Sequence, residues 1–488
     1  MTEALWTAAA AAAATRGTAT GNWTANGVTI DSRQVELDDL FIAISGPNHD
    51  GHAFAVDALA KGAAAVVVQE GKSSGLDAAK VLRVADTMTA LEDLARAARD
   101  RSTARIAAIT GSVGKTGTKE ALRLALQAQP GAAGSVTATE GNLNNHWGLP
   151  LSLARMPEAT RFGIFEMGMS SGGEISPLSR MARPHVALIT TVAHSHSEFF
   201  EGLEQIADAK AEIFDGLTED GTAVLNRDNA MYAHLLAAAR KAGATNIVTF
   251  GANAEADCRL LDVELHSQHS DIKAEINGRS IAYTLGVPGR HLALNSLGVL
   301  VAAQALGADV EQAARALKEM RGLAGRGERH QIALHHQGIE WTSFDLIDES
   351  YNASPASMTA AISVLTGSKP ALGGRRIAVL GDMLELGSKA EMLHAALVAP
   401  LAEGGIDKVF TAGRYMSSLW DALPNDMRAG HATTADALAP MVTAFIRPGD
   451  VVMVKGSLGS RTGQIVEALK NIPNAAGNDA APRVVNGG

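Results

Sequence analysis

A short glycine-rich loop, Gly111-Ser112-Val113-Gly114-Lys115-Thr116, limits most strongly what this chain can fold into. The apolar run Ile106–Thr110 precedes the loop, and a segment with helical periodicity follows it. In a strand–loop–helix unit of this kind, glycines let the backbone approach phosphate oxygens, and the amino terminus of the helix faces them. Lys115 would supply a mobile cation and Thr116 a hydroxyl for Mg²⁺. The loop therefore predicts an ATP site within an α/β layer.

The spacing of this loop leaves one alternative open. Ile109 stands where the longer phosphate-binding motif has its first glycine, so the loop has the shorter G-x-x-G-K-T form. An ordinary glycine-rich turn with an exposed lysine is the alternative interpretation.

Composition excludes several classes of protein. The formal net charge of -10 leaves no basic excess for a nucleic-acid backbone. The single cysteine, Cys258, excludes an intrachain disulfide framework and is typical of a reducing cytoplasm. The run Ala8–Ala14 lacks a basic flank and predicts a first helix rather than a signal peptide. We expect no membrane insertion, because no apolar stretch is long enough to span a bilayer.

The length of 488 residues predicts about three domains. Apolar runs in the central block end in polar residues and are followed by helical patterns, which indicates a mostly parallel, doubly wound sheet. Ligands of such sheets bind beyond the carboxyl ends of the strands. The patterns of the blocks before and after it also predict α/β domains. The expected domains are residues 1–102, 103–323 and 324–488, with a disordered tail from about residue 474.

Polar side chains follow the strands of the central block. Glu166 comes directly after the strand Phe162–Phe165, where a carboxylate beside a phosphate loop suits Mg²⁺. His194 and His196 follow the next strand, and no further ligands stand at zinc spacing near them. Lys210 lies in a helical pattern, and its spacing alone predicts a solvated surface lysine.

Several stretches of the chain, from about Val28 to about Ala468, resemble the Mur ligase family, the ATP-dependent amino-acid-adding enzymes of peptidoglycan assembly. Asp31-Ser32-Arg33 is similar to the part of the amino-terminal domain that holds the UDP group of the substrate. The Gly141–Asn145 stretch resembles the asparagine loop that faces the substrate, which implies substrate contacts for Asn144 and Asn145. The resemblance implies a central P-loop-type domain between an amino-terminal UDP-binding domain and a carboxyl-terminal Rossmann-like domain.

The resemblance also implies an ATP site built from two domains. Gly289–His291 with Asn295 resembles the adenine-contacting segment, and Gly325-Arg326-Gly327 resembles the segment whose arginine reaches the ATP phosphates. The Asp348–Pro355 stretch most resembles the members that add D-alanyl-D-alanine. The residues implied to bind ATP are those of the loop from Gly111 to Thr116, His291, Asn295, Arg326, Asp348 and Asn352, and Tyr351 is implied to contact the substrate.

The family's metal residues match Thr116, Glu166, His196 and Lys210, with Lys210 as a carbamate. Two Mg²⁺ ions are implied, and Lys115, His196 and Lys210 are implied to be catalytic. The segment around His194 departs from the family pattern, so either histidine could meet the metal. The spacing to Lys210 favours His196. Further departures are Gly117, where the family usually has Thr, and Glu349 and Ser354, which replace the commoner Asp and Asn.

The implied activity is an ATP-dependent acid–amino-acid ligase that forms ADP and phosphate in the cytoplasm. Its implied substrates are UDP-N-acetylmuramoyl-tripeptide and D-Ala-D-Ala, and we expect a monomer. The alternatives are a relative that adds another group, a folylpolyglutamate-type ligase, or a P-loop switch without amide chemistry. The third residue of the accepted tripeptide, lysine or meso-diaminopimelate, stays open.

Overall fold

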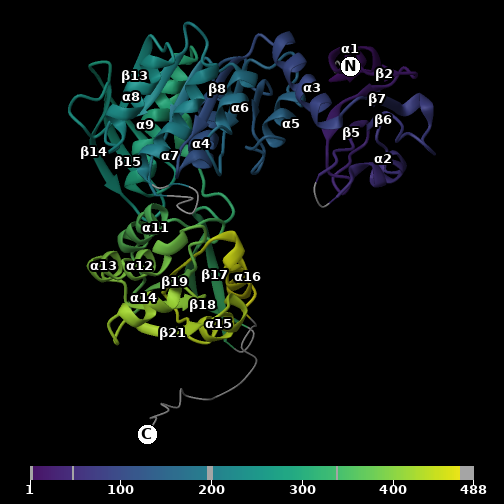
Figure 1. The fold of residues 1–488 in the computed structure, drawn as a ribbon. Coiled ribbons are helices and arrows are strands. Elements are labelled where there is room, and N and C mark those ends of the chain that lie inside the picture. Colours follow the sequence, from purple (N-terminus) through teal and green to yellow (C-terminus); the bar gives the residue numbers. More distant parts are fainter. Residues whose placement is uncertain (1–3, 47–48, 195–199, 201, 337–338, 473–488) are drawn as a thin grey trace.

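The fold is described by a computed structural model that covers residues 4–46, 49–194, 200, 202–336 and 339–472. Each of the chain's three larger sheets is built from one continuous part of the sequence. Figure 1 shows the amino-terminal unit beside the central one and the carboxyl-terminal unit beneath it. The predicted α/β class with a mostly parallel central sheet is confirmed. The predicted disordered tail lies outside the described residues.

The amino-terminal unit is a five-stranded sheet in the order β2-β7-β6-β5-β4. β2 is antiparallel to β7, and the other neighbours are parallel. The strands are β2 (Thr18–Ala19), β4 (Gly27–Thr29), β5 (Asp39–Ile42), β6 (Ala65–Gln69) and β7 (Val81–Val84), and the helices are α1 (Ala8–Thr15), α2 (Ala55–Ala60) and α3 (Thr87–Arg101). The alanine run predicted as a first helix is α1, whose amino terminus is capped by the side chain of Thr7.

The central unit is a nine-stranded sheet in the order β16-β15-β14-β13-β12-β11-β8-β10-β9. Its first six strands along the chain are β8 (Arg105–Thr110), β9 (Val136–Ala138), β10 (Phe162–Glu166), β11 (Val186–Ile189), β12 (Thr222–Asn226) and β13 (Asn246–Gly251). They are parallel to one another. β14 (Cys258–Leu265), β15 (Ser270–Ile276) and β16 (Arg279–Leu285) extend the edge as an antiparallel meander, which sequence analysis did not anticipate.

Helices cover both faces of this central sheet. Along β8, Ala107 and Ile109 are buried in one core, and Ile106 and Ala108 in the other. This alternation is what a doubly wound sheet requires, because successive side chains point to opposite faces. The helices are α4 (Lys115–Gln127), α5 (Gly148–Ala154), α6 (Ile175–Ala182), α7 (Leu203–Ala211), α8 (Tyr232–Lys241), α9 (Arg290–Ala305) and α10 (Val310–Ala316).

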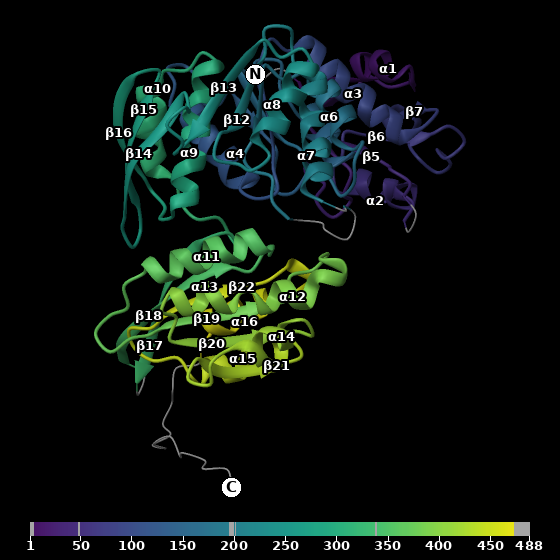
Figure 2. The same cartoon turned by 60° about the vertical axis from the view of Figure 1, so that its left-hand side comes forward.

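The carboxyl-terminal unit has a six-stranded sheet in the order β17-β18-β22-β19-β20-β21, parallel except for β17. In both ribbon views, α11 lies on the side of this unit that faces the central one (Figures 1 and 2). The strands are β17 (Glu328–His336), β18 (Ile339–Glu349), β19 (Arg376–Gly381), β20 (Lys408–Ala412), β21 (Arg428–Ala432) and β22 (Val451–Lys455). The helices are α11 (Pro355–Gly367), α12 (Ala390–Ala395), α13 (Val398–Glu403), α14 (Met416–Ala422), α15 (Ala435–Thr443) and α16 (Gly463–Lys470).

Direct hydrogen bonds join the amino-terminal unit to the central one. The indole N–H of Trp6 donates to the Ala154 carbonyl at 2.9 Å, and Arg155 Nε donates to the Val28 carbonyl at 2.7 Å. Leu151 and Ala154 of α5 are buried in the same core as Trp6. Within the described ranges, no helix combines the length and apolar character needed to cross a bilayer.

Candidate active site

The glycine-rich loop connects the buried end of β8 to the amino terminus of α4, as predicted. Gly111 has φ of 150° and Gly114 has φ of 89°, a region that side chains other than glycine rarely adopt. A Cβ on Gly111 would collide with Thr190, and the Thr190 hydroxyl donates to the Val113 carbonyl at 2.7 Å. The loop is therefore shaped by its own glycines and held by the end of β11. No pattern in the sequence pointed to Thr190.

Lys115 folds back over this loop. Its Nζ donates to the Gly111 carbonyl at 2.7 Å. The pKa of Lys115 is lowered, mainly by loss of hydration, while Glu166 opposes the shift and Arg326 adds to it. Lys115 therefore lies near both the carboxylate of Glu166 and the cation of Arg326, as a group that binds the outer phosphates of a nucleotide would.

Three predicted residues form a hydrogen-bonded chain across the ends of the strands. Thr116 Oγ1 donates to Glu166 Oε2 at 2.9 Å, and Asn144 Nδ2 donates to Oε1 at 2.8 Å. The Glu166 backbone N–H donates to the Thr139 hydroxyl at 3.0 Å. Glu166 is 2% exposed, so its carboxylate is oriented on both oxygens before any ligand arrives. Hydroxyl and carboxylate oxygens beside a phosphate loop are ligands that suit Mg²⁺.

Lys210 is buried near this chain, on α7. Its exposure is 2%, so the surface position that spacing alone predicted is wrong. Desolvation, with the charge of Lys115 as a smaller cause, lowers the pKa of Lys210 well below its ordinary value. A neutral amine is the form that can react with CO₂ to give a carbamate.

Of the two histidines predicted as possible metal ligands, the structure describes one. His194 is exposed at the end of the segment after β11. His196 lies outside the described residues, so its implied metal role remains a prediction.

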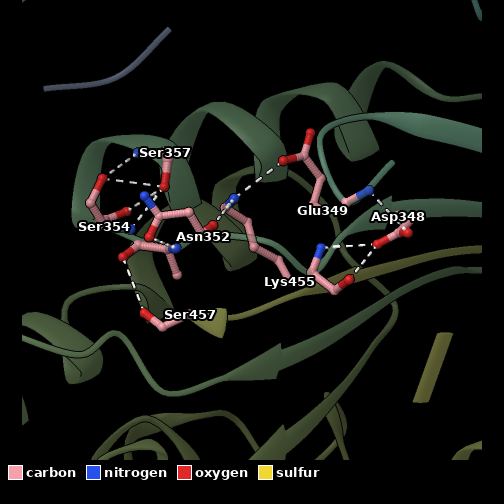
Figure 3. A network of polar contacts seen from close by, with 10 residues as sticks. Asp348, Glu349, Asn352, Ser354, Ser357, Lys455 and Ser457 are labelled. Atoms are coloured by element: carbon pink, nitrogen blue, oxygen red, sulfur yellow. Dashed lines mark hydrogen bonds and ion pairs between the residues drawn. The ribbon is translucent and has the colours of Figure 1, made fainter. Parts of the chain in front are cut away.

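A second wall of the site comes from the carboxyl-terminal unit. Asp348, which is 5% exposed, accepts hydrogen bonds from the Gly325 N–H at 3.2 Å and from the Ser350 hydroxyl at 2.6 Å (Figure 3). The Arg326 guanidinium lies 4.3 Å from the centre of the Tyr351 ring, a cation–π distance. Asp348 therefore acts by shaping the turn that carries Arg326.

Lys455, at the end of β22, is a residue that sequence analysis missed. Its Nζ donates to Glu349 Oε2 at 3.2 Å and to the Asn352 carbonyl at 2.8 Å (Figure 3). Ser457 follows it and donates through its backbone N–H and hydroxyl to neighbouring loops. A lysine at the carboxyl end of a parallel strand, followed by Gly-Ser, was the signal available in the sequence.

These two walls enclose a cavity of about 440 Å³. Its lining from the central unit includes Ser112, Val113, Gly114, Lys115, Asn144, Asn145, Glu166 and His291, and its lining from the other side includes Arg326, Glu349, Tyr351, Asn352 and Lys455. His291 is poorly hydrated there, which lowers its pKa, with Glu349 opposing the shift and Lys455 adding to it. The cavity therefore brings together most of the residues predicted to bind ATP.

Some predicted site residues lie away from this cavity lining. Thr116 and Asp348 hydrogen-bond to residues of the lining, and the Asn295 amide nitrogen lies 2.5 Å from where a Cβ on Gly114 would be. Ser32 and Arg33 belong to the amino-terminal unit, where Arg33 Nη2 contacts Asp31 Oδ2 at 2.7 Å. Their predicted contact with the substrate needs a ligand long enough to reach both units.

Family models match all three parts of the chain. They are described as "Mur ligase family, catalytic domain" over residues 24–99, "Mur ligase middle domain" over 109–303, and "Mur ligase, glutamate ligase domain" over 336–458.

Curated relatives match nearly the full length. The UDP-N-acetylmuramoyl-tripeptide–D-alanyl-D-alanine ligase of Rickettsia prowazekii (strain Madrid E) is 36% identical and covers 91% of this chain and 94% of its own length. The enzyme of the same name from Escherichia coli (strain K12) is 32% identical, with 92% and 94% covered.

Solved structures agree in fold. MurF from Acinetobacter baumannii superimposes with a TM-score of 0.81 at 28% identity, covering 96% of this chain and 99% of the other. MurF ligase from Thermotoga maritima in complex with ADP gives a TM-score of 0.73 at 25% identity, with 91% and 97% covered. On its motifs, its three α/β units and these matches, the chain belongs to the Mur ligase family.

Proposed function

We propose that this chain is the ATP-dependent ligase that joins D-alanyl-D-alanine to UDP-N-acetylmuramoyl-tripeptide in peptidoglycan precursor synthesis. The observation that carries the proposal is the cavity in which Lys115 and Glu166 face Arg326 and Lys455. This arrangement places cations suited to phosphate on both walls of a cavity that also contains a carboxylate suited to a metal ion. The full-length relatives that carry this activity in their names support the choice of substrates.

The reaction needs an activated carboxylate, because a free carboxylate is a poor electrophile. A carboxylate oxygen of the tripeptide attacks the γ-phosphorus of ATP, and ADP leaves. The amine nitrogen of D-Ala-D-Ala then attacks the carbonyl carbon of the acyl phosphate, phosphate leaves, and the nitrogen loses a proton. Lys115 and Arg326 offset the repulsion between the two anions of the first step, and such positioned charge is usually a large catalytic contribution.

The residues around Glu166 fit Mg²⁺, because its buried carboxylate meets the Thr116 hydroxyl beside the phosphate loop. We place one ion with Thr116 and Glu166, and a second with Glu166, His196 and a carbamylated Lys210. When bound, the ions would neutralise phosphate charge and polarise the phosphoryl oxygens. The buried, poorly solvated amine of Lys210 supports the carbamate, because only the neutral form is nucleophilic.

The remaining assignments follow from this function. Ser32, Arg33, Asn144, Asn145 and Tyr351 would contact the UDP-linked substrate. The domain boundaries would lie at 102/103 and 323/324. We propose a monomer in the cytoplasm, where ATP is available. For the nucleotide, we assign Gly111, Ser112, Val113, Gly114, Lys115, Thr116, His291, Asn295, Arg326 and Asn352, with Asp348 acting through the turn that carries Arg326.

A phosphate-release assay tests the function against its alternatives. ATP is supplied with UDP-N-acetylmuramoyl-tripeptide, with and without D-Ala-D-Ala, and separately with the corresponding dipeptide and diaminopimelate. We expect phosphate release only with the tripeptide and D-Ala-D-Ala. A requirement for diaminopimelate would assign another member of the family, and release without an acceptor would favour a nucleotide switch. Lysine- and diaminopimelate-containing tripeptides, tried in parallel, identify the accepted third residue.

The carbamate has its own test. We expect Lys210→Ala to lose most activity, because neither the amine nor its carbamate remains. Wild-type turnover in this variant would contradict the role of Lys210, while leaving the ligase assignment to the acceptor assay.

A further inference from the structure

We propose that the hairpin between β14 and β15 forms a site for a transition-metal ion of the Zn²⁺ class, separate from the proposed Mg²⁺ site. Its ligands are His266, His269 and Asp271. Among the residues that the structure describes, these are the one group of at least three potential metal ligands whose donor atoms all lie within 4.8 Å of one another.

The register of the hairpin places these side chains on one face. Leu265 pairs with Ser270, and the His266 N–H donates to the His269 carbonyl at 2.9 Å, so the two histidines stand opposite each other at the turn. Asp271 follows His269 by two residues and therefore points to the same side of the strand. Glu264 pairs directly with Asp271 and adds a second acidic group to this face.

The distances suit tetrahedral coordination. His266 Nε2 lies 3.2 Å, and His269 Nε2 3.7 Å, from Asp271 Oδ2. Metal bonds of about 2.0–2.2 Å at tetrahedral angles place ligand atoms about 3.3–3.6 Å apart. The imidazole rings are stacked with their centres 4.3 Å apart, so both nitrogens can meet one ion by rotation of the side chains.

Two further observations support a ligand at this place. His266 Nε2 is shielded from solvent, and apart from its 3.2 Å contact with Asp271 Oδ2 it has no hydrogen-bond partner among the described residues. A metal ion between the two groups would satisfy this nitrogen. The other oxygen of Asp271, Oδ1, accepts a hydrogen bond from the Thr284 hydroxyl on β16 at 2.7 Å. Thr284 thus orients the carboxylate so that Oδ2 faces the histidines, as outer groups do for metal ligands.

The proposed site adjoins the active-site region. His269 and Asp271 line a cavity of about 790 Å³ together with Lys318, Arg321 and Arg329. An ion held by three protein ligands keeps a fourth position for water or an anion. Histidine and carboxylate donors select Zn²⁺, Co²⁺ or Ni²⁺ over Mg²⁺, which prefers oxygen ligands.

The hairpin also holds the segment before His291. The hydroxyl of Ser270, which lies between His269 and Asp271, donates to the Val287 carbonyl at 3.0 Å and accepts from the Gly289 N–H at 3.2 Å. A metal ion that binds the folded chain and not the unfolded chain stabilises the folded chain by mass action. The unfolding temperature is a readout that does not depend on activity.

The test uses the full chain, free of any purification tag, in excess Mg²⁺. Wild type and the control His234→Ala should bind one equivalent of Co²⁺ with the intense visible absorption of tetrahedral coordination. His234 is a matched control because it pairs with Asp208 at 2.6 Å in the same unit and is not part of the group of three ligands. Zn²⁺ should raise the Tm of both proteins.

The ligand variants should lose this binding. We expect no tetrahedral Co²⁺ signal and no Zn²⁺-dependent rise of Tm in His266→Ala/His269→Ala. The near-isosteric Asp271→Asn should bind Co²⁺ at least about tenfold more weakly. So should Thr284→Val, which removes the hydroxyl that orients the Asp271 carboxylate. Unchanged binding in the double variant and in Asp271→Asn would overturn the proposal. Loss of the signal in His234→Ala would also overturn it, because the signal would then belong to dispersed surface histidines.

Discussion

Lys210 shows how burial changes the chemistry of a single residue. A lysine in solution has a pKa of about 10.4 and is a poor ligand for a cation. The 2% exposure of Lys210 lowers that pKa by desolvation, with Lys115 as a second cause. In the interval between the folded and unfolded pKa values, the unfolded chain binds more protons, so stability rises with pH through that interval.

We therefore expect Lys210→Met to be more stable than wild type near neutral pH but inactive. Methionine fills a similar volume without a group that must give up its charge on burial, and it cannot form a carbamate. Activity should fall by at least about 10²-fold. Urea unfolding in bicarbonate-free buffer should show a stability difference that shrinks as the pH rises toward about 10. A difference that grows with pH would contradict the lowered pKa.

His185 is a second residue with a shifted pKa, and its effect has a defined pH range. Its Nδ1 accepts the backbone N–H of Ile106 on β8 at 2.9 Å, which requires the unprotonated ring. Desolvation, with Arg105 and Arg99 as smaller causes, lowers the pKa of His185 to about 4 from an ordinary value of 6.5. The stabilisation is therefore present above about pH 6.5 and is lost as the pH falls toward 4.

On acidification through this range, wild type should lose up to about 3 kcal/mol more unfolding free energy than His185→Asn, which lacks the titrating ring. Chemical unfolding at several pH values measures the difference. Equal acid sensitivity of the two proteins would show that His185 does not titrate in this window.

At the scale of elements, the amino terminus of α4 contains two glycines in different backbone conformations. Gly114 has φ of 89°, and a Cβ there would press on the Asn295 amide. Gly117 lies inside α4, where a Cβ would find only the Met320 side chain, at 4.0 Å. The same substitution should therefore have opposite effects three residues apart.

We expect Gly114→Ala to lower the unfolding free energy by about 1–2 kcal/mol and to weaken ATP binding, because alanine is strained at positive φ. Gly117→Ala should raise the unfolding free energy by about 0.5–1 kcal/mol, the helix-propensity gain over glycine. Denaturant unfolding and nucleotide titration of the two variants check this. Equal effects at both positions would refute the conformational argument.

At the scale of the whole molecule, the connections between units differ in strength. The amino-terminal unit is joined to the central one by a shared core around Trp6 and Leu151 and by the hydrogen bond from Arg155 to Val28. The central and carboxyl-terminal units meet instead across the cavity that contains Lys115 and Arg326. Domain closure on ligand binding should therefore move the carboxyl-terminal unit.

Fluorescence energy transfer between engineered surface cysteines can measure this motion. The native Cys258 is buried, and its pKa is raised to about 12 by desolvation, so it should resist labelling. ATP with the UDP-linked substrate should change transfer between Lys241→Cys and Glu403→Cys, which report on the central and carboxyl-terminal units. Transfer between Lys80→Cys and Lys241→Cys should stay constant. The reverse pattern would mean that the amino-terminal unit moves.

Local sequence determined much of this protein. The glycine loop, the strand before it and the helix after it could be predicted because backbone conformation and hydrophobic pattern are local properties. The carboxylate at the end of β10 could be placed for the same reason, since parallel strands present their carboxyl ends at one edge. Family motifs added Arg326 and Asp348, which no local pattern joins to Lys115.

The tertiary structure decided which groups meet and how they ionise. Only the fold buries Lys210, sets Thr190 beneath the phosphate loop and brings Lys455 into the cavity opposite Glu166. The register of β14 and β15 likewise gathers His266 and Asp271 on one face. Burial and proximity depend on contacts between residues far apart in the chain, and these determine hydration and charge interactions, so spacing along the sequence could not reveal them.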